Sequence, residues 1–232
     1  MFSLLLYLLR AELSAPDKSL DIPDAIRALP THPSVNSLLK RCLDIAGGVV
    51  GLLITLCLLV PIAIAIQLDS PGPVFYRQVR CGYRGRLFYI WKFRSMVANA
   101  EEIKHLVENQ AQGLIFKNDH DPRITRVGRF LRRTSLDEFP QFWNVLKGDM
   151  SLVGTRPPTL GEVRQYEPHH WQRLNVKPGL TGKWQAQGRS AIRDFEAIVK
   201  MDLDYQAQWS LEHDVRLILE TIGAVVFSKG AC

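Results

Sequence analysis

The chain has 232 residues, of which 47% are apolar, so it is long enough to form one hydrophobic core without crosslinks. The excess of 29 Lys and Arg over 23 Asp and Glu gives a net charge of +6, which favours an anionic partner: a membrane surface, a phosphorylated substrate or nucleic acid. The four cysteines and six histidines show no CxxC pair and no HExxH motif, which argues against a disulfide framework and a zinc site. We interpret the adjacent His169 and His170 as surface residues.

The segment before residue 38 has mixed charge and contains Pro16, Pro23, Pro30 and Pro33. Prolines at this density interrupt regular structure, so residues 1–37 are predicted to form a loosely ordered leader with one short helix at Ile22 to Leu29. The apolar tip MFSLLLYLL is too short to span a membrane.

An uncharged run, IAGGVVGLLITLCLLVPIAIAI, extends from Ile45 to Ile66. As a helix it would reach about 33 Å, enough to cross the hydrocarbon core of a bilayer. It begins too far into the chain and is too long for a signal peptide. The run therefore predicts a membrane helix, and Asp44 at its edge is expected to be neutralised by Lys40 or Arg41.

Basic residues flank this run on both sides, which pulls both of its ends toward the cytoplasm. They are Lys40 and Arg41 before it and Arg77, Arg80, Arg84 and Arg86 after it. Pro61 removes a backbone donor inside the run and favours a kink. Two topologies stay open on these grounds: a re-entrant helix that returns to the side it entered, or a straight single-pass anchor.

A hairpin is predicted at Val74 to Arg94, because turn residues are followed by an alternating pattern. Helices are predicted at Val97 to Val107, Asp194 to Gln208 and Leu211 to Phe227. The last carries an apolar stripe, which faces either the core or a membrane. The stripe consists of Val215, Ile218, Leu219, Ile222 and Val226.

The stretch from Lys117 to Arg133 is basic and carries apolar residues at helical spacing. It is either a solvated helix face or a surface that contacts lipid headgroups or substrate phosphates.

The segment TSLDEFPQFWNVLKGDMSLVGTRP, Thr134 to Pro157, places two carboxylates side by side. Ser135 and Glu138 have capping-box spacing, and the apolar pattern that follows predicts a helix ending near Gly148. Asp137 and Glu138 would then lie in its first turn, both exposed on the polar side. One could attack a phosphorus while the other holds Mg²⁺, and the residues alone do not decide which.

Five ordered motifs carry a resemblance to a known family. They are KRCLDIAGG, DSPGPVFYRQVR, WKFRSM, RRTSLDEFPQFWNVLKGDMSLVGTRP and VKPGLTGKWQAQGR. Over residues 38 to about 228 the chain resembles the bacterial sugar transferase family, the monotopic polyprenyl-phosphate phosphoglycosyl transferases. The resemblance implies transfer of a sugar-1-phosphate from a UDP-sugar to undecaprenyl phosphate, with release of UMP, at the cytoplasmic face of the bacterial inner membrane. It also implies the re-entrant helix.

The family's residue roles fall on matching positions of this chain. The resemblance implies that Asp137 is the nucleophile, that Glu138 is the Mg²⁺ ligand, and that Arg132 and Arg156 contact phosphate oxygens. It also makes Pro61 the helix-breaking proline. In the Gly-rich segment VKPGLTGKWQAQGRS, Lys177 and Arg189 could close around the nucleotide, although such segments are also common as plain turns.

The expected fold is α+β and mostly helical. Residues 38–68 form a re-entrant membrane helix-break-helix, and residues 69–232 form a small cytoplasmic catalytic domain with a short β-hairpin and interfacial helices. The chain resembles the minimal catalytic form of the family, without the extra membrane helices and soluble domain of longer members. The expected partners are a UDP-sugar, undecaprenyl phosphate, Mg²⁺ and a phospholipid membrane, with a homodimer left open and nucleic acid not expected.

The transferred group is expected to be glucose- or galactose-1-phosphate, as in members that start exopolysaccharide, capsule or O-antigen repeat units. The alternatives are an N-acetylhexosamine phosphate, or a non-catalytic membrane scaffold of a polysaccharide assembly machine.

Overall fold

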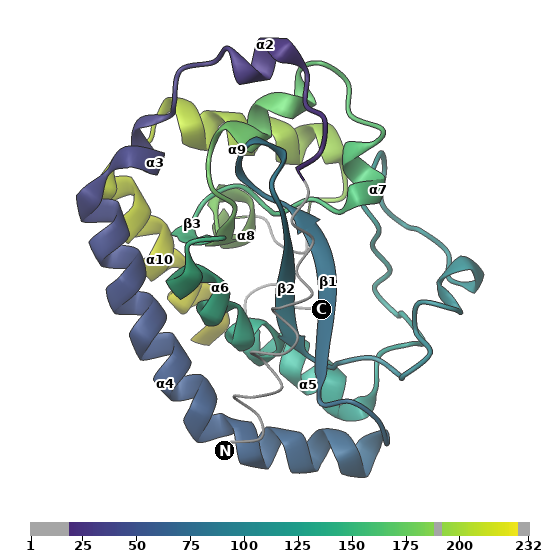
Figure 1. Ribbon diagram of the computed structural model, residues 1–232. Coiled ribbons are helices and arrows are strands. Elements are labelled where there is room, and N and C mark those ends of the chain that lie inside the picture. The colour runs from purple at the N-terminus through teal and green to yellow at the C-terminus, as the bar shows by residue number, and fades with distance from the viewer. Residues whose placement is uncertain (1–18, 188–191, 227–232) are drawn as a thin grey trace.

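The computed structural model describes residues 19–187 and 192–226 (Figure 1). The helices are α2 (Asp24–Arg27), α3 (Pro33–Asn36), α4 (Leu38–Asp69), α5 (Arg126–Arg133), α6 (Phe142–Lys147), α7 (Leu160–Val163), α8 (Lys183–Gln187), α9 (Phe195–Ala207) and α10 (Leu211–Val226). The strands are β1 (Phe75–Cys81), β2 (Leu87–Phe93), β3 (Ser151–Val153) and β4 (Gly179–Thr181). The 3₁₀ helices are η1 (Tyr83–Gly85), η2 (Lys104–Leu106), η3 (Leu136–Gln141) and η4 (His170–Asn175). The mostly helical α+β class is confirmed.

The predicted hairpin is confirmed as the antiparallel pair β1 and β2, in which Tyr76 lies opposite Lys92 and Gln78 opposite Ile90. Since side chains alternate along a strand, one face of the hairpin carries Tyr76, Gln78 and Arg80. A second sheet, the parallel pair β3 and β4, was not predicted, because its strands have only three residues each.

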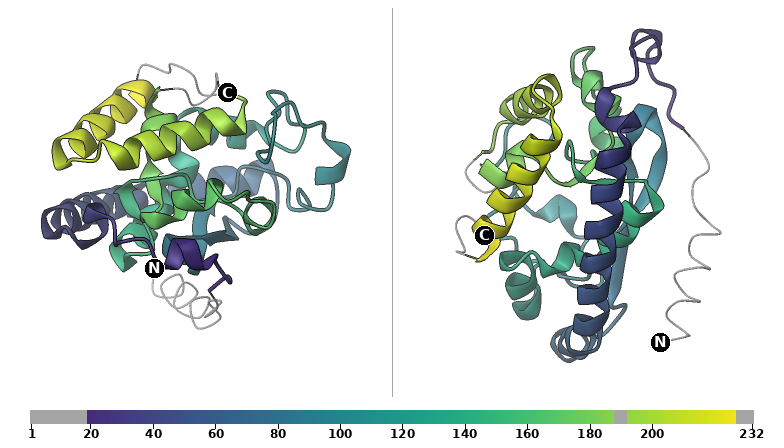
Figure 2. Two further views of the ribbon diagram at one scale, coloured as in Figure 1. Left: turned by 90° about the horizontal axis from the view of Figure 1, so that it is seen from above. Right: turned by 90° about the vertical axis from the view of Figure 1, so that its left-hand side faces the viewer.

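The long apolar helix α4 is bent rather than broken. Its helical assignment continues from Leu38 to Asp69 through Pro61. In Figure 1 its first part descends on the left and the remainder runs along the bottom, and the side view of Figure 2 shows the lower part end-on. The predicted helix-break-helix is therefore a bend within one helix, and Pro61 inside this helix removes a backbone hydrogen bond, which favours bending.

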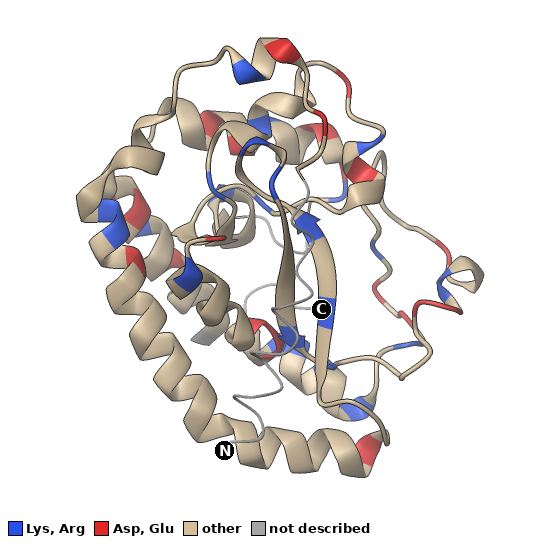
Figure 3. Ribbon diagram, in the orientation of Figure 1, with Lys and Arg blue, Asp and Glu red and all other residues tan. Residues whose placement is uncertain are grey.

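Helix α4 is long and apolar enough to cross a membrane, and only 22% of its most apolar 18-residue window is buried. The core helix of a soluble protein would be mostly buried. Its charged residues are confined to its two ends (Figure 3). Large apolar side chains are exposed along its length: Leu38, Leu39, Ile45, Val49, Val50, Leu53, Ile54, Leu56, Val60, Ile64 and Leu68.

The two parts of α4 pack against different elements. The first part lies on α6, where a Cβ at Gly48 would come 2.8 Å from Leu146, and a Cβ at Gly51 would come 2.4 Å from the Phe142 ring. The second part packs on α5 and the hairpin through a cluster of buried residues: Ile62, Ile66, Phe93 and Leu131. The bend thus follows the surface of the domain.

The polar residues at the start of α4 are satisfied by the domain. The charges of Lys40 and Arg41 both act on Asp44, as expected, but its hydrogen bonds come from elsewhere: Asp44 accepts from the Ser151 hydroxyl (2.8 Å) and the Leu152 backbone N–H (2.9 Å). Arg41 donates to two backbone carbonyl oxygens of α6. Lys40 forms an ion pair with α10 that is discussed below.

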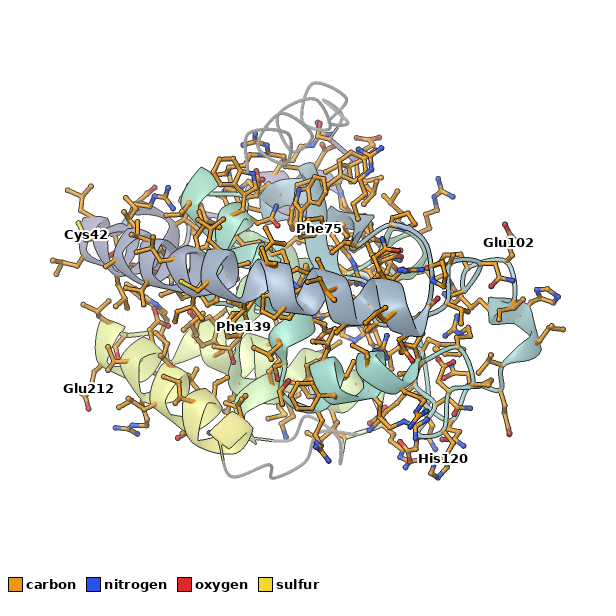
Figure 4. The ribbon with its side chains drawn as sticks, turned by 90° about the horizontal axis from the view of Figure 1, so that it is seen from below. Cys42, Phe75, Glu102, His120, Phe139 and Glu212 are labelled. Atoms are coloured by element: carbon orange, nitrogen blue, oxygen red, sulfur yellow. The ribbon has the colours of Figure 1, made fainter. Side chains whose placement is uncertain are left out.

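Two further helix predictions are confirmed, as α9 and α10, and one is wrong. Residues 97–107 form turns around the short η2, not a continuous helix. On α10, Val215, Leu219 and Ile222 are exposed, whereas Leu217 on the other side is fully buried, so these three stripe residues do not face the core. Seen from below, α4 crosses the molecule with α5 and α10 beside it (Figure 4).

The part of the leader that the structure describes contains α2, close to the predicted short helix, and a second short helix, α3, that was not predicted. Ile22 and Ile26 are buried, and α2 contacts η4. Residues 1–18 lie outside the described residues.

Candidate functional site

The two adjacent carboxylates lie in the 3₁₀ helix η3, which packs against α4, α5 and β2. The predicted capping box is wrong: Ser135 has a left-handed backbone with φ of 58° and makes no capping hydrogen bond through its side chain. The tight turn at Ser135 ends α5 and allows η3 to start at once. The predicted helix end is confirmed, since Gly148 terminates α6 with φ of 88°.

Only one of the two carboxylates is open to the surface. Asp137 is 5% exposed, so the expectation that both would be exposed is wrong for this residue. Glu138 is half-buried, and Lys92 of β2 donates to its Oε1 at 2.6 Å. A 3₁₀ helix turns by about 120° per residue, which directs adjacent side chains to different surroundings.

The two predicted arginines are held in different ways. Arg156 forms an ion pair with Glu162 at 3.0 Å, and Glu162 belongs to the capping box of α7 with Thr159. Burial acts to raise the pKa of Glu162, but the charge of Arg156 and its hydrogen bonds outweigh burial and lower it. Arg132 donates through Nε to the Ser95 hydroxyl at 2.9 Å, an uncharged acceptor.

Two adjoining cavities lie near the carboxylate segment; Glu138 lines the smaller one, and Asp137 is not in the lining of either. The larger, of about 420 Å³, has seven basic and two acidic residues in its lining. The basic ones are Arg80, Lys92, Arg94, Lys104, Arg123, Arg132 and Arg156. The smaller, of about 150 Å³, is lined by Glu138 among others. Both are lined by Arg80, Lys92 and Arg156, which we call the shared cations.

The electrostatics of these cavities favour an anion. Burial, and then repulsion by Arg156, lower the pKa of Arg80 to about 10. Arg80 donates to the Pro157 carbonyl oxygen and to the Gln78 side chain, both of which are uncharged. A bound phosphate or diphosphate would relieve the repulsion among the shared cations and would form charge-assisted hydrogen bonds with them.

Two of the shared cations, Arg80 and Lys92, were not identified as site residues from the sequence. The usable signal was the alternation in the hairpin, since Tyr76, Gln78 and Arg80 are two residues apart and share a face. Without the register, nothing in the sequence indicated that this face, rather than the opposite one, meets Arg156.

The two nucleotide candidates are not brought to this place within the described residues. Lys177 lines another cavity, of about 280 Å³, with Lys40, Arg41 and Asp44 at the start of α4. Burial, together with the nearby charge of Arg41, lowers the pKa of Lys177. Arg189 lies outside the described residues.

The interpretation of both adjacent histidines as surface residues is wrong for His170, which is buried. His169, His170 and Glu196 lie close enough to hold a metal ion. However, the Glu167 N–H donates to Nδ1 of His170, so Nε2 carries the proton and donates to Glu196 at 2.6 Å. That proton occupies the ring nitrogen that a metal would need, and the group is satisfied as it stands.

The family model of the bacterial sugar transferases matches residues 35–228, and the chain belongs to this family. It is 51% identical over 195 residues to the galactosyl transferase CpsE of Streptococcus agalactiae serotype III. It is 42% identical over 199 residues to an undecaprenyl-phosphate galactose phosphotransferase of Salmonella typhimurium. It is 40% identical over 206 residues to the UDP-glucose:undecaprenyl-phosphate glucose-1-phosphate transferase of Escherichia coli K12.

These alignments cover 83%, 83% and 85% of this chain but only 43%, 41% and 42% of the three relatives. The chain thus spans less than half the length of each relative. Each alignment includes most of residues 35–228, the part of the chain that the family model matches.

Proposed function

We propose that the protein is a phosphoglycosyl transferase that moves a hexose-1-phosphate from a UDP-sugar to undecaprenyl phosphate and releases UMP. The observation that carries this proposal is the pair of adjoining cavities, in which the shared cations lie beside Glu138 in a chain of this family. Concentrated positive charge suits a diphosphate substrate. The names of the three relatives specify galactose or glucose, which favours a hexose over an N-acetylhexosamine.

Asp137 is the proposed nucleophile. Its carboxylate oxygen attacks the phosphorus that bears the sugar, and the bond from that phosphorus to the bridging oxygen breaks, so that UMP leaves with the oxygen. A phosphate oxygen of undecaprenyl phosphate then attacks the same phosphorus and restores the carboxylate. Because the transfer occurs in two steps, the two anionic substrates do not have to react with each other directly. The 5% exposure of Asp137 supports this role, because restricted access of water protects an acyl phosphate from hydrolysis.

The shared cations and Arg132 have the proposed task of neutralising phosphate oxygens. Glu138 has the proposed task of holding Mg²⁺, and the donor set fits this ion, which takes one or two carboxylates and completes its shell with water and substrate phosphate oxygens. Bound there, Mg²⁺ would offset charge on the diphosphate. Lys92 donates to Glu138 where this carboxylate lines the small cavity.

The membrane topology is part of the proposal. We propose that α4 is re-entrant in the bacterial inner membrane, with the domain on the cytoplasmic face. The bend of α4, its exposed apolar surface and the basic residues on both flanks support this arrangement. Helix α10 lies on the same underside as α4 (Figure 4) and carries exposed apolar residues, which supports its assignment as an interfacial helix.

Release of UMP tests the reaction. The full chain in detergent is incubated with undecaprenyl phosphate, Mg²⁺ and one UDP-sugar at a time: UDP-glucose, UDP-galactose or the corresponding N-acetyl sugars. We expect UMP from one of the hexose substrates. Release from the N-acetyl sugars alone would replace the hexose with the alternative group. No release from any of them would favour the non-catalytic scaffold.

A single cysteine tests the topology. Asn36 is exposed and lies just before α4, so Asn36→Cys is introduced after the four native cysteines are replaced. If α4 is re-entrant, an impermeant thiol reagent labels this residue only after cells are permeabilised. Labelling in intact cells would establish a straight span instead. Pro61→Leu in the same background is expected to shift the helix toward the straight form.

A further inference from the structure

Three residues that line the small cavity each carry one buried polar atom with no hydrogen-bond partner among the residues that the structure describes. The atoms are Nε of Arg80, Nε1 of Trp184 and Oε1 of Gln185. Buried polar groups in native proteins are almost always hydrogen-bonded, and leaving one unpaired costs about 1–3 kcal/mol. Two unpaired donors and one unpaired acceptor on the lining residues of a single cavity therefore point to a ligand with hydroxyl or amide groups.

Close glycine contacts place these residues beside Arg156. A Cβ at Gly179 would lie 2.1 Å from the Gly154 nitrogen, and a Cβ at Gly182 would lie 2.2 Å from the Gly154 oxygen. The segment that carries Arg156 and the segment that leads into α8 thus touch backbone to backbone. As a result, the Trp184 ring comes to 6.0 Å from the guanidinium carbon of Arg156.

The two cavities differ in size and in what borders them. The large cavity, of about 420 Å³, falls within the range of about 300–1,000 Å³ that is typical of sites for nucleotide-sized ligands, whereas the small one, of about 150 Å³, has room for a single ring. The small cavity is the one that Glu138 borders, and the shared cations separate it from the large one.

We infer that the small cavity binds the sugar ring of the UDP-sugar, that the large cavity binds the uridine, and that Trp184 and Gln185 are specificity-determining residues for the sugar. This inference rests on the proposed function. The diphosphate then lies across the shared cations, and the phosphorus that bears the sugar is on the side of Glu138. In the opposite placement, uridine would occupy the cavity that Glu138 borders, and the bond that must break would lie further from this carboxylate.

The chemistry of the cavity fits a hexose. Ile90, Leu180 and the face of Trp184 supply an apolar wall for the C–H groups of the ring. The indole N–H can donate to one sugar hydroxyl, and Oε1 of Gln185 can accept from another. A site that hydrogen-bonds a hydroxyl discriminates strongly against an analogue that lacks it, because its own buried group is then left unpaired.

The test separates sugar recognition from nucleotide recognition. Trp184→Phe removes only the indole N–H and part of the ring, and Gln185→Met removes the acceptor at similar volume. For each variant of the full chain, kcat/KM is measured with the preferred UDP-sugar, and inhibition by UMP, which has no sugar, is measured in the same assay. Trp171→Phe, which alters the partly buried tryptophan packed against the cluster of Cys81, Val163 and Leu174, is the matched control.

We expect each cavity variant to lower kcat/KM at least about tenfold while UMP inhibition stays within about twofold of the wild type. Single-deoxy analogues of the sugar sharpen the assignment: for the hydroxyl that Gln185 contacts, the loss caused by the analogue and the loss caused by Gln185→Met should not add. The control should match the wild type.

Weakening of UMP inhibition as large as the loss of kcat/KM in both variants would place the nucleotide in the small cavity and overturn the inference. Unchanged kcat/KM, or additive losses at every hydroxyl, would overturn it as well. Failure of the proposed function is distinguishable, because the wild type itself would then release no UMP from any UDP-sugar. If one variant does not fold, the other decides, since each alters a different atom of the same cavity.

Discussion

Two buried charged regions of this molecule are built in opposite ways. At the start of α4, Lys40 donates to Asp214 of α10 at 2.5 Å and to the Val153 carbonyl oxygen at 3.0 Å. Asp214 also accepts from the Tyr205 hydroxyl at 2.7 Å and from the Trp209 indole at 3.1 Å. One cation meets one anion, and hydrogen bonds complete both. We call this group the Lys40 cluster.

At the adjoining cavities, by contrast, basic residues outnumber acidic ones, and three buried polar atoms lack a partner among the described residues. Because an uncompensated buried charge is costly, such an arrangement persists where a ligand supplies the missing charge. Burial of a charge alone therefore does not distinguish the two regions. What distinguishes them is that the cavities hold more basic than acidic residues and that Arg80 donates to uncharged groups there. Substitutions in the Lys40 cluster should affect stability, and substitutions at the cavities should affect turnover.

The largest expected effect is that of Asp137→Asn, which removes the proposed nucleophile at constant shape. Turnover should fall by about 10⁴-fold or more, with the thermal stability preserved. Radiolabelled UDP-sugar without a lipid acceptor, followed by denaturation, should leave label on the wild type and none on the variant. Sequential kinetics, in which both substrates must bind before UMP is released, together with the absence of a trapped adduct, would contradict this role and make Asp137 a general base.

Glu138→Gln should lower the rate and weaken the dependence on Mg²⁺.

The next largest effect concerns stability. Asp214→Ala leaves Lys40 buried without its counter-charge, which should lower the free energy of unfolding by about 3–5 kcal/mol. Denaturant titration of the purified protein measures this change. Replacing both partners, as Lys40→Met with Asp214→Leu, should recover most of the loss. A large loss of turnover in the fraction of Asp214→Ala that stays folded would contradict the division between the two regions.

Arg132→Ala should slow turnover about a hundredfold, or about 2.7 kcal/mol in transition-state free energy, with little change in stability, because Arg132 donates to the uncharged Ser95 hydroxyl. Arg156→Ala should cost a similar factor and also destabilise the fold, since it leaves Glu162 unpaired. Lysine should rescue each only in part, because it lacks the planar fork. Turnover near that of the wild type in both alanine variants would remove these arginines from the site.

The smallest expected effect is a pH dependence. The pKa of Glu162 is lowered from its ordinary 4.5, so its contribution to stability is fully present above that value and is lost as the pH falls below it. The contribution should be on the order of 1 kcal/mol. Comparing denaturation of the wild type and Glu162→Gln between pH 6 and pH 3 measures it. The two curves should converge at the acidic end, and a constant separation would assign the acid sensitivity to other groups.

Much of this architecture could be predicted from local patterns. The uncharged run predicted α4, the alternation predicted the hairpin, and the 3.6-residue periodicity predicted α9 and α10, because in each case the signal is carried by neighbouring residues. The ordered motifs indicated the family, which the family model confirms over residues 35–228. The carboxylate pair and the two arginines were selected from one contiguous segment.

What only the tertiary structure decided depends on contacts between distant segments. The capping box expected at Ser135 and Glu138 does not form, because Ser135 has a left-handed backbone and Lys92 donates to Glu138. A capping box is found instead at Thr159 and Glu162. The counter-charge of Lys40 comes from α10 and not from its neighbour Asp44. A sequence specifies which charges exist, but the burial that makes each one costly, and the partner that relieves it, are set by how the chain packs.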